Sequence, residues 1–197
     1  MLSDAHRDML EYESGIDRSV ISERGYTTVT ADSDLLTPWS DDQRGDGLLI
    51  PGWTIHGTPV PGQLRRDVPR VKTKGGKEFE LKYESPAGGE NYVDVHPRTR
   101  DRVRNGHEPL IIVEGVKKQD SGISRGLLVV ALPGVWSWKG RDTGLLSDFD
   151  AIPLRRRSVI VCYDADVASK PEVQHAIRRL SAVLKKMGAI VSSVDWR

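Results

Sequence analysis

Three acidic residues stand where two short apolar segments end. Glu114 follows the segment 110–113, and Asp164 and Asp166 belong to the end of the segment that begins at 158. Carboxylate oxygens are the ligands that Mg²⁺ and Mn²⁺ prefer in proteins. Asp164 and Asp166 are two residues apart, so in an extended chain their side chains point the same way. The pattern predicts a divalent metal site, although alternating acids also occur in simple turns after strands.

The two apolar segments belong to a region in which strands and helices alternate. Continuous apolar runs of about four to eight residues fit strands that are buried on both faces. Alternation of strand and helix implies a mainly parallel sheet with right-handed crossovers, whose ligands bind beyond the carboxyl ends of the strands. The expected strands are 110–113, 127–131, 158–163 and 190–194, and the expected helices lie near 115–124 and 171–187. The three acids should therefore meet at one sheet edge.

The first part of the chain has a different pattern. Residues 3–24 are predicted to be helical, with Ser3 as a cap and Gly25 as the terminating residue. Residues 27–46 are polar and are expected to form loop or weak structure. The segment 48–65 contains two apolar runs around a glycine, which indicates a β-hairpin.

Prolines and a turn motif indicate the kind of strands in the hairpin and the position of a domain boundary. Pro51, Pro59 and Pro61 fall within the predicted hairpin, so its strands should lie at edges or contain bulges. Asn105-Gly106 marks a turn and the expected boundary between two domains, 1–105 and 106–197.

Basic residues gather between residues 62 and 82. The cations are Arg65, Arg66, Arg70, Lys72, Lys74, Lys77 and Lys82. Phosphate backbones attract such clusters, with an affinity that falls steeply with salt, but a charge cluster in a glycine-containing loop can also be plain solvated surface. The alternation in 79–83 predicts a strand that places Lys82 on the opposite face from Leu81.

Composition sets limits on the class of protein. A net charge of +1 gives no global electrostatic argument for nucleic acid. The single cysteine, Cys162, excludes an internal disulfide and a cysteine-rich zinc site, and we expect it to be a buried thiol. No apolar signal segment or membrane span is evident, so a cytoplasmic protein without a membrane partner is expected. Trp136 and Trp138 would either stack on bases or plug the core, and the second use is favoured.

Several motifs together resemble a known family. The C-terminal motifs are Val113-Glu114-Gly115, a loop with Gly134, and Tyr163-Asp164-Ala165-Asp166 before a helix. They resemble the TOPRIM domain of bacterial replicative primases, topoisomerases and some nucleases. The upstream motifs are Leu49-Ile50-Pro51, Gln63-Leu64-Arg65, Lys82-Tyr83-Glu84-Ser85-Pro86 and His96-Pro97-Arg98. They are similar to the N-terminal subdomain of the bacterial primase core, and the resemblance is greatest to the primase-like TOPRIM proteins of phages and plasmids.

This resemblance implies a fold and an activity. The fold would be α/β, a Rossmann-like TOPRIM domain with a mainly parallel sheet, preceded by a smaller α+β primase-type subdomain. The activity would be metal-dependent nucleotidyl transfer that makes primers on single-stranded DNA from nucleoside triphosphates. Glu114, Asp164 and Asp166 would be catalytic and would hold Mg²⁺ or Mn²⁺. The residues expected to contact nucleotide or DNA are Arg65, Lys82, Arg70, Lys72, Lys74, Lys117 and Lys118.

The sequence also departs from the primase pattern. Lys118 stands where primases carry an acid, the acids that follow the last strand are missing before Arg197, and no Cys/His zinc module precedes the core. The chain is therefore expected to be either the front piece of a larger protein that ends in a helicase, or a reduced relative. A replicative helicase, in the same chain or a separate one, is an expected partner. Two rival functions stay open: a TOPRIM metal-dependent DNA nuclease, and a nucleic-acid-binding module that has lost the full metal set.

Overall fold

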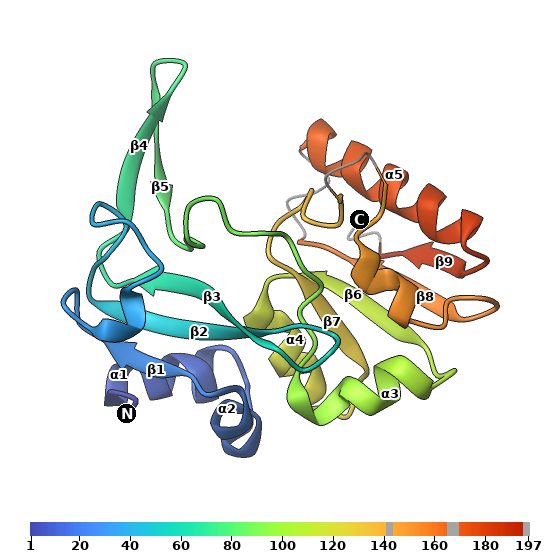
Figure 1. Cartoon of the computed structure of the whole chain (residues 1–197), viewed down its shortest axis with the longest axis horizontal. Helices are drawn as coiled ribbons and strands as arrows, with labels where there is room; N and C mark the ends of the chain where they lie inside the picture. Colours follow the sequence, from blue (N-terminus) through green and yellow to red (C-terminus); the bar gives the residue numbers. More distant parts are fainter. Residues whose placement is uncertain (141–143, 165–169, 195–197) are drawn as a thin grey trace.

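The computed structural model of the chain describes residues 1–140, 144–164 and 170–194, apart from the side chain of Lys74. Figure 1 shows the N-terminal helices and antiparallel strands beside a parallel sheet with its helices. The elements in chain order are α1 (Asp4–Asp8), η1 (Met9–Glu13), α2 (Arg18–Arg24), β1 (Thr27–Val29), η2 (Asp34–Leu36), β2 (Gly47–Trp53), β3 (Pro59–Arg66), β4 (Arg70–Lys74), β5 (Lys77–Leu81), η3 (Pro97–Thr99), α3 (Arg100–Asn105), β6 (Leu110–Glu114), α4 (Val116–Ile123), β7 (Val129–Leu132), η4 (Ser147–Ala151), β8 (Ser158–Cys162), α5 (Pro171–Lys186) and β9 (Ile190–Ser193). Within the residues described, no helix is long and apolar enough to cross a lipid bilayer.

The N-terminal helices begin and end where the sequence predicts. The Ser3 hydroxyl accepts a hydrogen bond from the amide of His6 at 3.2 Å and so caps α1. The π-helical turn η1 ends at Glu13 and α2 begins at Arg18, so the predicted helical region 3–24 is interrupted between these residues. Gly25 follows α2 with a φ of 87°, the left-handed conformation that glycine adopts without strain.

The predicted hairpin is confirmed as β2 and β3. These strands belong to an antiparallel sheet with the order β1-β2-β3, in which β3 is an edge strand. Pro51 lies where the register shifts between Ile50 and Gly52, and Pro59 and Pro61 lie on the edge strand. All three prolines therefore occupy positions where a missing N–H group is tolerated.

Strand β1 was not predicted, and the expected loop over 27–46 is wrong at its start. Thr27, Thr28 and Val29 pair with β2 in antiparallel register. Their β-branched side chains favour a strand. Three residues are too few for alternation of apolar and polar side chains to reveal one.

Strands β4 and β5 form a separate two-stranded antiparallel sheet, which Figure 1 shows projecting beyond the three-stranded sheet. The sequence predicted a strand near β5 but placed the preceding cations in a loop, and β4 corrects that expectation. The turn consists of Gly75 and Gly76, whose φ angles of 59° and 77° favour glycine. None of the described residues of this hairpin belongs to a hydrophobic cluster of the protein.

The alternating region forms the expected parallel sheet, with strand order β7-β6-β8-β9. All three neighbouring pairs are parallel, and Val113 of β6 lies opposite Ala131 of β7 and Cys162 of β8. The carboxyl ends of the three strands therefore lie at the same sheet edge. This α/β architecture confirms the predicted fold class.

Both faces of the parallel sheet are covered. On one face, Ile112 belongs to a hydrophobic cluster that includes Leu180 and Leu184 of α5. On the other face, Val113 belongs to a second cluster that contains α4 and residues of the N-terminal half. The N-terminal members of this second cluster are Leu10, Ile16, Val20, Ile21, Tyr26, Leu48 and Ile50. The two halves of the chain thus share one apolar core, while the predicted boundary near residue 105 stays a prediction.

Candidate functional site between the two halves

Two of the three predicted acids meet at the carboxyl edge of the parallel sheet. Glu114 is the last residue of β6, and Asp164 lies two residues beyond the end of β8. Because β6 and β8 are parallel neighbours, both carboxylates reach one cavity of about 280 Å³. Asp166 lies outside the described residues. The strand topology therefore supports the predicted meeting of Glu114 and Asp164.

The cavity is formed by both halves of the chain. The parallel-sheet half supplies Glu114, Gly115, Val116, Lys117, Lys118, Pro133 and Asp164, and the N-terminal half supplies Ile50, Gln63 and Tyr83. Gly115, with a φ of 94°, lets the chain turn from β6 directly into α4. This turn brings Lys117 and Lys118, in the first turn of α4, beside the two acids.

Lys118 forms an ion pair with Asp164 across the cavity. The two side chains are 45% and 49% exposed, so solvent screens the pair. An ammonium group on Asp164 neutralises the carboxylate that a divalent cation would need. The sequence marked Lys118 as a departure from the primase pattern, and the structure places its charge directly on a predicted metal ligand.

The two acids that the structure describes, Glu114 and Asp164, fit a hard divalent cation. Glu114 and Asp164 offer carboxylate oxygens to the same cavity, and such oxygens are suitable ligands for Mg²⁺ and Mn²⁺. No group of three or more potential metal ligands is found in residues 1–140, 144–164 and 170–194. Asp166, the third predicted ligand, falls between these ranges, so the three-acid site stays a prediction.

The segment after the hairpin is tied to the cavity wall. Glu84 and Leu64 exchange backbone hydrogen bonds of 2.9 and 3.0 Å, which hold this segment beside β3. Tyr83 consequently lines the cavity, and the exposed Lys82 precedes it in the chain. Arg65 shares a face of β3 with Gln63, two residues away, and is half-buried. The predicted contacts of Lys82 and Arg65 with nucleotide or DNA stay predictions.

The other predicted cations lie on the hairpin, away from the cavity lining. Lys72 is exposed on β4, and Lys74 is the last residue of that strand. Arg70 donates to the buried carboxylate of Glu84, with an Nε–Oε1 distance of 3.1 Å, and also pairs with Asp42. These bonds anchor the base of the hairpin and give Arg70 a structural role that the sequence did not predict. Its predicted contact with DNA stays untested.

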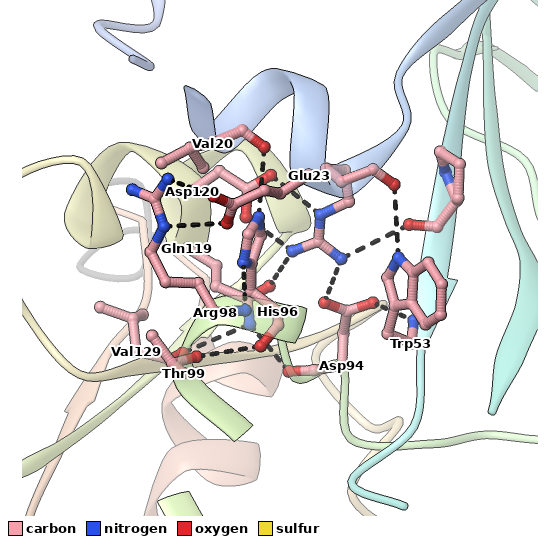
Figure 2. Close-up of polar contacts among 12 residues, drawn as sticks. Val20, Glu23, Trp53, Asp94, His96, Arg98, Thr99, Gln119, Asp120 and Val129 are labelled. Atoms are coloured by element: carbon pink, nitrogen blue, oxygen red, sulfur yellow. Dashed lines mark hydrogen bonds and ion pairs between the residues drawn. The ribbon is translucent and has the colours of Figure 1, made fainter. Parts of the chain in front are cut away.

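A buried ion-pair network that the sequence did not predict joins α2, α4 and the segment around Asp94 (Figure 2). Arg24 of α2 donates to both oxygens of Asp120 at 2.9 and 2.6 Å and to Asp94 at 2.6 Å. All three side chains are fully buried. Arg24 also donates to Gln119 at 2.9 Å, and Tyr26 donates to Asp120 at 2.8 Å. The network therefore joins α2 in the N-terminal half to α4, the helix that carries the cavity lysines.

Backbone groups complete this network. Asp94 accepts a hydrogen bond from the amide of Trp53 at 3.0 Å, and Gln119 donates to the carbonyl of Asp94 at 2.9 Å. Burial raises the pKa of Asp94, against the opposing effect of the Arg24 charge. Burial, followed by the Asp120 charge, raises the pKa of Tyr26. Gln119 and Asp120 lie between Val116 and Ile123 on the buried face of α4, so the helical spacing could have indicated that they are buried, although not which residues they contact.

His96 adjoins the same network and gives a pH prediction. Its Nδ1 atom accepts from the Arg98 amide at 3.1 Å, and its Nε2 atom lies 3.2 Å from the Val20 carbonyl oxygen. Burial is the main cause that lowers the pKa of His96 below 6.5. Between the lowered pKa and 6.5 the unfolded state binds more protons than the folded state, so stability should fall as pH falls through this window.

Urea unfolding between pH 8 and pH 5 tests this prediction, with His96→Asn as the comparison. Asn keeps an acceptor for the Arg98 amide but cannot titrate. The variant should have a flatter pH dependence below pH 6.5 than the wild-type protein. Equal pH dependence in the two proteins would contradict the prediction.

The tryptophans after β7 pack mainly into the core, which is the role that the sequence favours over stacking on bases. Trp138 is buried in the cluster beneath α5, and the half-buried Trp136 packs against it with a centroid distance of 5.9 Å. The Lys139 ammonium lies 3.9 Å from the Trp136 ring centroid. Cys162, expected to be buried, is half-buried, and burial raises the pKa of its thiol.

Two comparisons by sequence match part of the chain. A family described as "Domain of unknown function (DUF3854)" matches residues 101–197. An uncharacterized protein of Picosynechococcus sp. strain PCC 7002 is 31% identical over 101 residues, and the match covers 45% of this chain and 10% of that protein. The chain thus spans about a tenth of the curated relative that it matches.

Solved primase structures cover almost the whole chain. The zinc-binding and RNA polymerase domains of Aquifex aeolicus primase match with a TM-score of 0.62 at 15% identity, over 98% of this chain and 50% of that one. The RNA polymerase domain of Mycobacterium tuberculosis primase DnaG matches with a TM-score of 0.58 at 18% identity, over 99% and 71%. A DnaG catalytic domain bound to single-stranded DNA matches with a TM-score of 0.58 at 14% identity, over 98% and 67%. The chain therefore has the fold of DnaG primase catalytic cores, including the TOPRIM-like parallel sheet.

Proposed function

We propose that the chain is a primase-type catalytic core, which joins nucleotides into primers on single-stranded DNA during phage or plasmid replication. The observation that carries this proposal is the cavity at the edge of the parallel sheet, where Glu114 and Asp164 meet two lysines. Carboxylates for a divalent cation and ammonium groups for phosphates are the side chains that nucleotidyl transfer requires. The fold supports the proposal, and one similar structure is a DnaG domain bound to single-stranded DNA.

The acids would form the metal site of this core. Glu114, Asp164 and Asp166 would hold Mg²⁺ or Mn²⁺, and such an ion, when bound, neutralises negative charge on the transferred phosphoryl group. Glu114 either supplies an oxygen ligand or accepts the proton of the attacking 3′-hydroxyl. Both roles suit its position at the end of β6, where it lines the cavity.

The cations would bind the substrates. Lys117 and Lys118 line the cavity and would contact the phosphates of a nucleoside triphosphate. Arg65 lies two positions after Gln63 and Lys82 directly before Tyr83, and both would contact nucleotide phosphate or the template-primer backbone. Arg70, Lys72 and Lys74 would add salt-sensitive affinity for the template. A replicative helicase, in the same polypeptide or a separate one, is the protein partner in this proposal.

One observation favours a second candidate, a nucleic-acid-binding module without catalysis. The ammonium of Lys118 already neutralises Asp164, so the described acids carry less net negative charge than a metal-binding pair. In this alternative the cavity would bind phosphate without a metal, and DNA binding would not depend on Mg²⁺ or on Asp164.

Calorimetric titration with Mn²⁺ separates the two candidates. The wild-type chain should bind Mn²⁺, and Asp164→Asn combined with Asp166→Asn should remove binding, because two of the proposed oxygen ligands lose their charge. Asp101→Asn is the matched control, since Asp101 is exposed on α3 outside the cavity lining. A well-folded wild-type chain that binds no Mn²⁺ would favour the binding module. Nicking of plasmid DNA with Mn²⁺ but without nucleotides would instead favour a nuclease.

The same titration tests the effect of Lys118. Lys118→Met should bind Mn²⁺ about fivefold more tightly, because the metal no longer has to displace the ammonium group from Asp164. Two unit charges about 4 Å apart in water attract each other by about 1 kcal/mol, which corresponds to that factor. Lys186→Met, at the far end of α5, should leave the affinity unchanged. Weaker binding by Lys118→Met would contradict competition between this lysine and the metal for Asp164.

A further inference from the structure

The pairing register of the β4–β5 hairpin separates its charges onto two faces. Directly opposed residues of an antiparallel pair share a face, and the face alternates along each strand. Lys72 lies opposite Phe79, and Lys77 lies two residues before Phe79 on the same strand. Lys72, Lys77 and Phe79 therefore form one face, which we call the basic face. The opposite face, called the acidic face, contains Val71, Thr73, Glu78 and Glu80.

The side chains of the basic face are available to a partner. Phe79 is 42% exposed, although a large apolar side chain gains most from burial in a core. Lys72 and Lys77 are exposed, and within the described part of the chain neither has an ion-pair partner. Among the described side chains of the hairpin none belongs to a hydrophobic cluster, so core packing does not explain why an aromatic residue stands at position 79.

The hairpin is held in a defined position relative to the cavity. Arg70 at its base is bonded to Glu84, which in turn is paired through its backbone with Leu64 of β3. Phe79 is four positions before Tyr83, which lines the cavity, so the Cα atoms of the two residues are at most about 14 Å apart. Figure 1 shows the segment after β5 running from the base of the hairpin toward the parallel sheet. The basic face and the cavity are therefore connected by a short segment of the chain, whose end is fixed by the pairing of Glu84 with Leu64.

We propose that the basic face binds single-stranded nucleic acid, with Phe79 stacked on an unpaired base and Lys72 and Lys77 bound to phosphates. Aromatic side chains between cations are the arrangement that binds single strands without sequence preference. A duplex does not offer the face of a base to Phe79, because its bases stack on each other. The acidic face repels phosphates, so it restricts the strand to one side of the hairpin. This inference rests on the proposed function for the identity of the strand, but it concerns binding alone.

Fluorescence anisotropy with a labelled single-stranded oligonucleotide, in EDTA and without nucleotides, tests the inference. Phe79→Ala should weaken binding about five- to a hundredfold, the range for loss of one stacked base. Val71→Ala is the matched control, because Val71 is 54% exposed on the acidic face of the same hairpin. This control should change the affinity less than twofold. Equal effects of the two substitutions would overturn the inference.

Salt dependence tests the lysines separately. Lys72→Gln combined with Lys77→Gln should lower the slope of log affinity against log salt by about 1.4, because each phosphate contact on a single strand contributes about 0.7. Glu78→Gln combined with Glu80→Gln, on the acidic face, should leave the slope unchanged. An unchanged slope in the lysine variant would remove the phosphate contacts from the proposal.

Two further ligands identify the kind of contact. An abasic single strand has the same phosphates but no bases, so Phe79→Ala should not alter its binding, and duplex DNA should be equally insensitive. Loss of affinity for the abasic strand would show that Phe79 supports the hairpin rather than a base, which would overturn the stacking role. These binding measurements need no metal. Absence of primer synthesis would therefore refute the proposed catalysis but would leave the proposal that the basic face binds single strands to be judged by the binding data alone.

Discussion

The Arg24→Met variant should lose about 3–5 kcal/mol of the free energy of unfolding, because removal of one partner leaves buried charges without compensation. Arg24 makes hydrogen bonds to Asp94 and Asp120, and the three side chains are fully inaccessible to solvent. Met replaces the aliphatic part of the side chain but provides no donor. Urea unfolding at pH 7 measures the loss.

Arg18→Met is the matched control on the same helix. Arg18 pairs with Glu11, and its side chain is 79% exposed, so its substitution should lower the free energy of unfolding far less than Arg24→Met does. The deficit of Arg24→Met should also shrink at low pH, since Asp94 is more easily protonated when the neighbouring cation is absent. A loss below 1 kcal/mol in Arg24→Met would contradict the role assigned to the network.

The second large effect concerns the cavity. If the proposed function holds, Glu114→Gln and Asp164→Asn should each reduce template-dependent primer synthesis about a thousandfold, because several kcal/mol of transition-state stabilisation would depend on the carboxylates that we propose as metal ligands. The substitutions are nearly isosteric, and both residues lie at the surface of the cavity. Thermal unfolding should therefore remain close to that of the wild-type chain.

Incorporation of labelled nucleotides on single-stranded DNA, with Mn²⁺ present, measures this effect. Asp101→Asn should retain full synthesis, and the two cavity variants should retain metal-free binding of single-stranded DNA. Synthesis that persists in both cavity variants would place the chemistry elsewhere. Synthesis absent from the wild-type chain under these conditions would instead support the binding module.

The parallel sheet could be predicted because its signal is local. Each of its central strands is a continuous apolar run, and α5 repeats apolar residues at helical spacing. The positions of Glu114 and Asp164 then follow from one topological rule about strand ends. By contrast, β4 is polar and exposed, so no burial pattern in the sequence separates it from a solvated loop.

The buried network could not be predicted because its members are distant in the sequence. Arg24 is separated by 70 positions from Asp94 and by 96 from Asp120, and an arginine near a helix end is ordinarily exposed. Only the three-dimensional packing of α2 on α4 brings these charges together. The ion pair between Lys118 and Asp164 likewise joins residues 46 positions apart. The sequence identified Lys118 as unusual but not the carboxylate that it contacts.

The apolar core that both halves share bears on how this protein can be divided. The family match begins at residue 101, yet Val113, Val116 and Ala131 are covered by Leu10, Val20, Leu48 and Ile50 from outside that match. A fragment that starts near residue 101 would present this apolar face to water and would lack the cation for Asp120. The segment recognised by sequence similarity therefore lacks the residues that cover one face of its sheet in this protein.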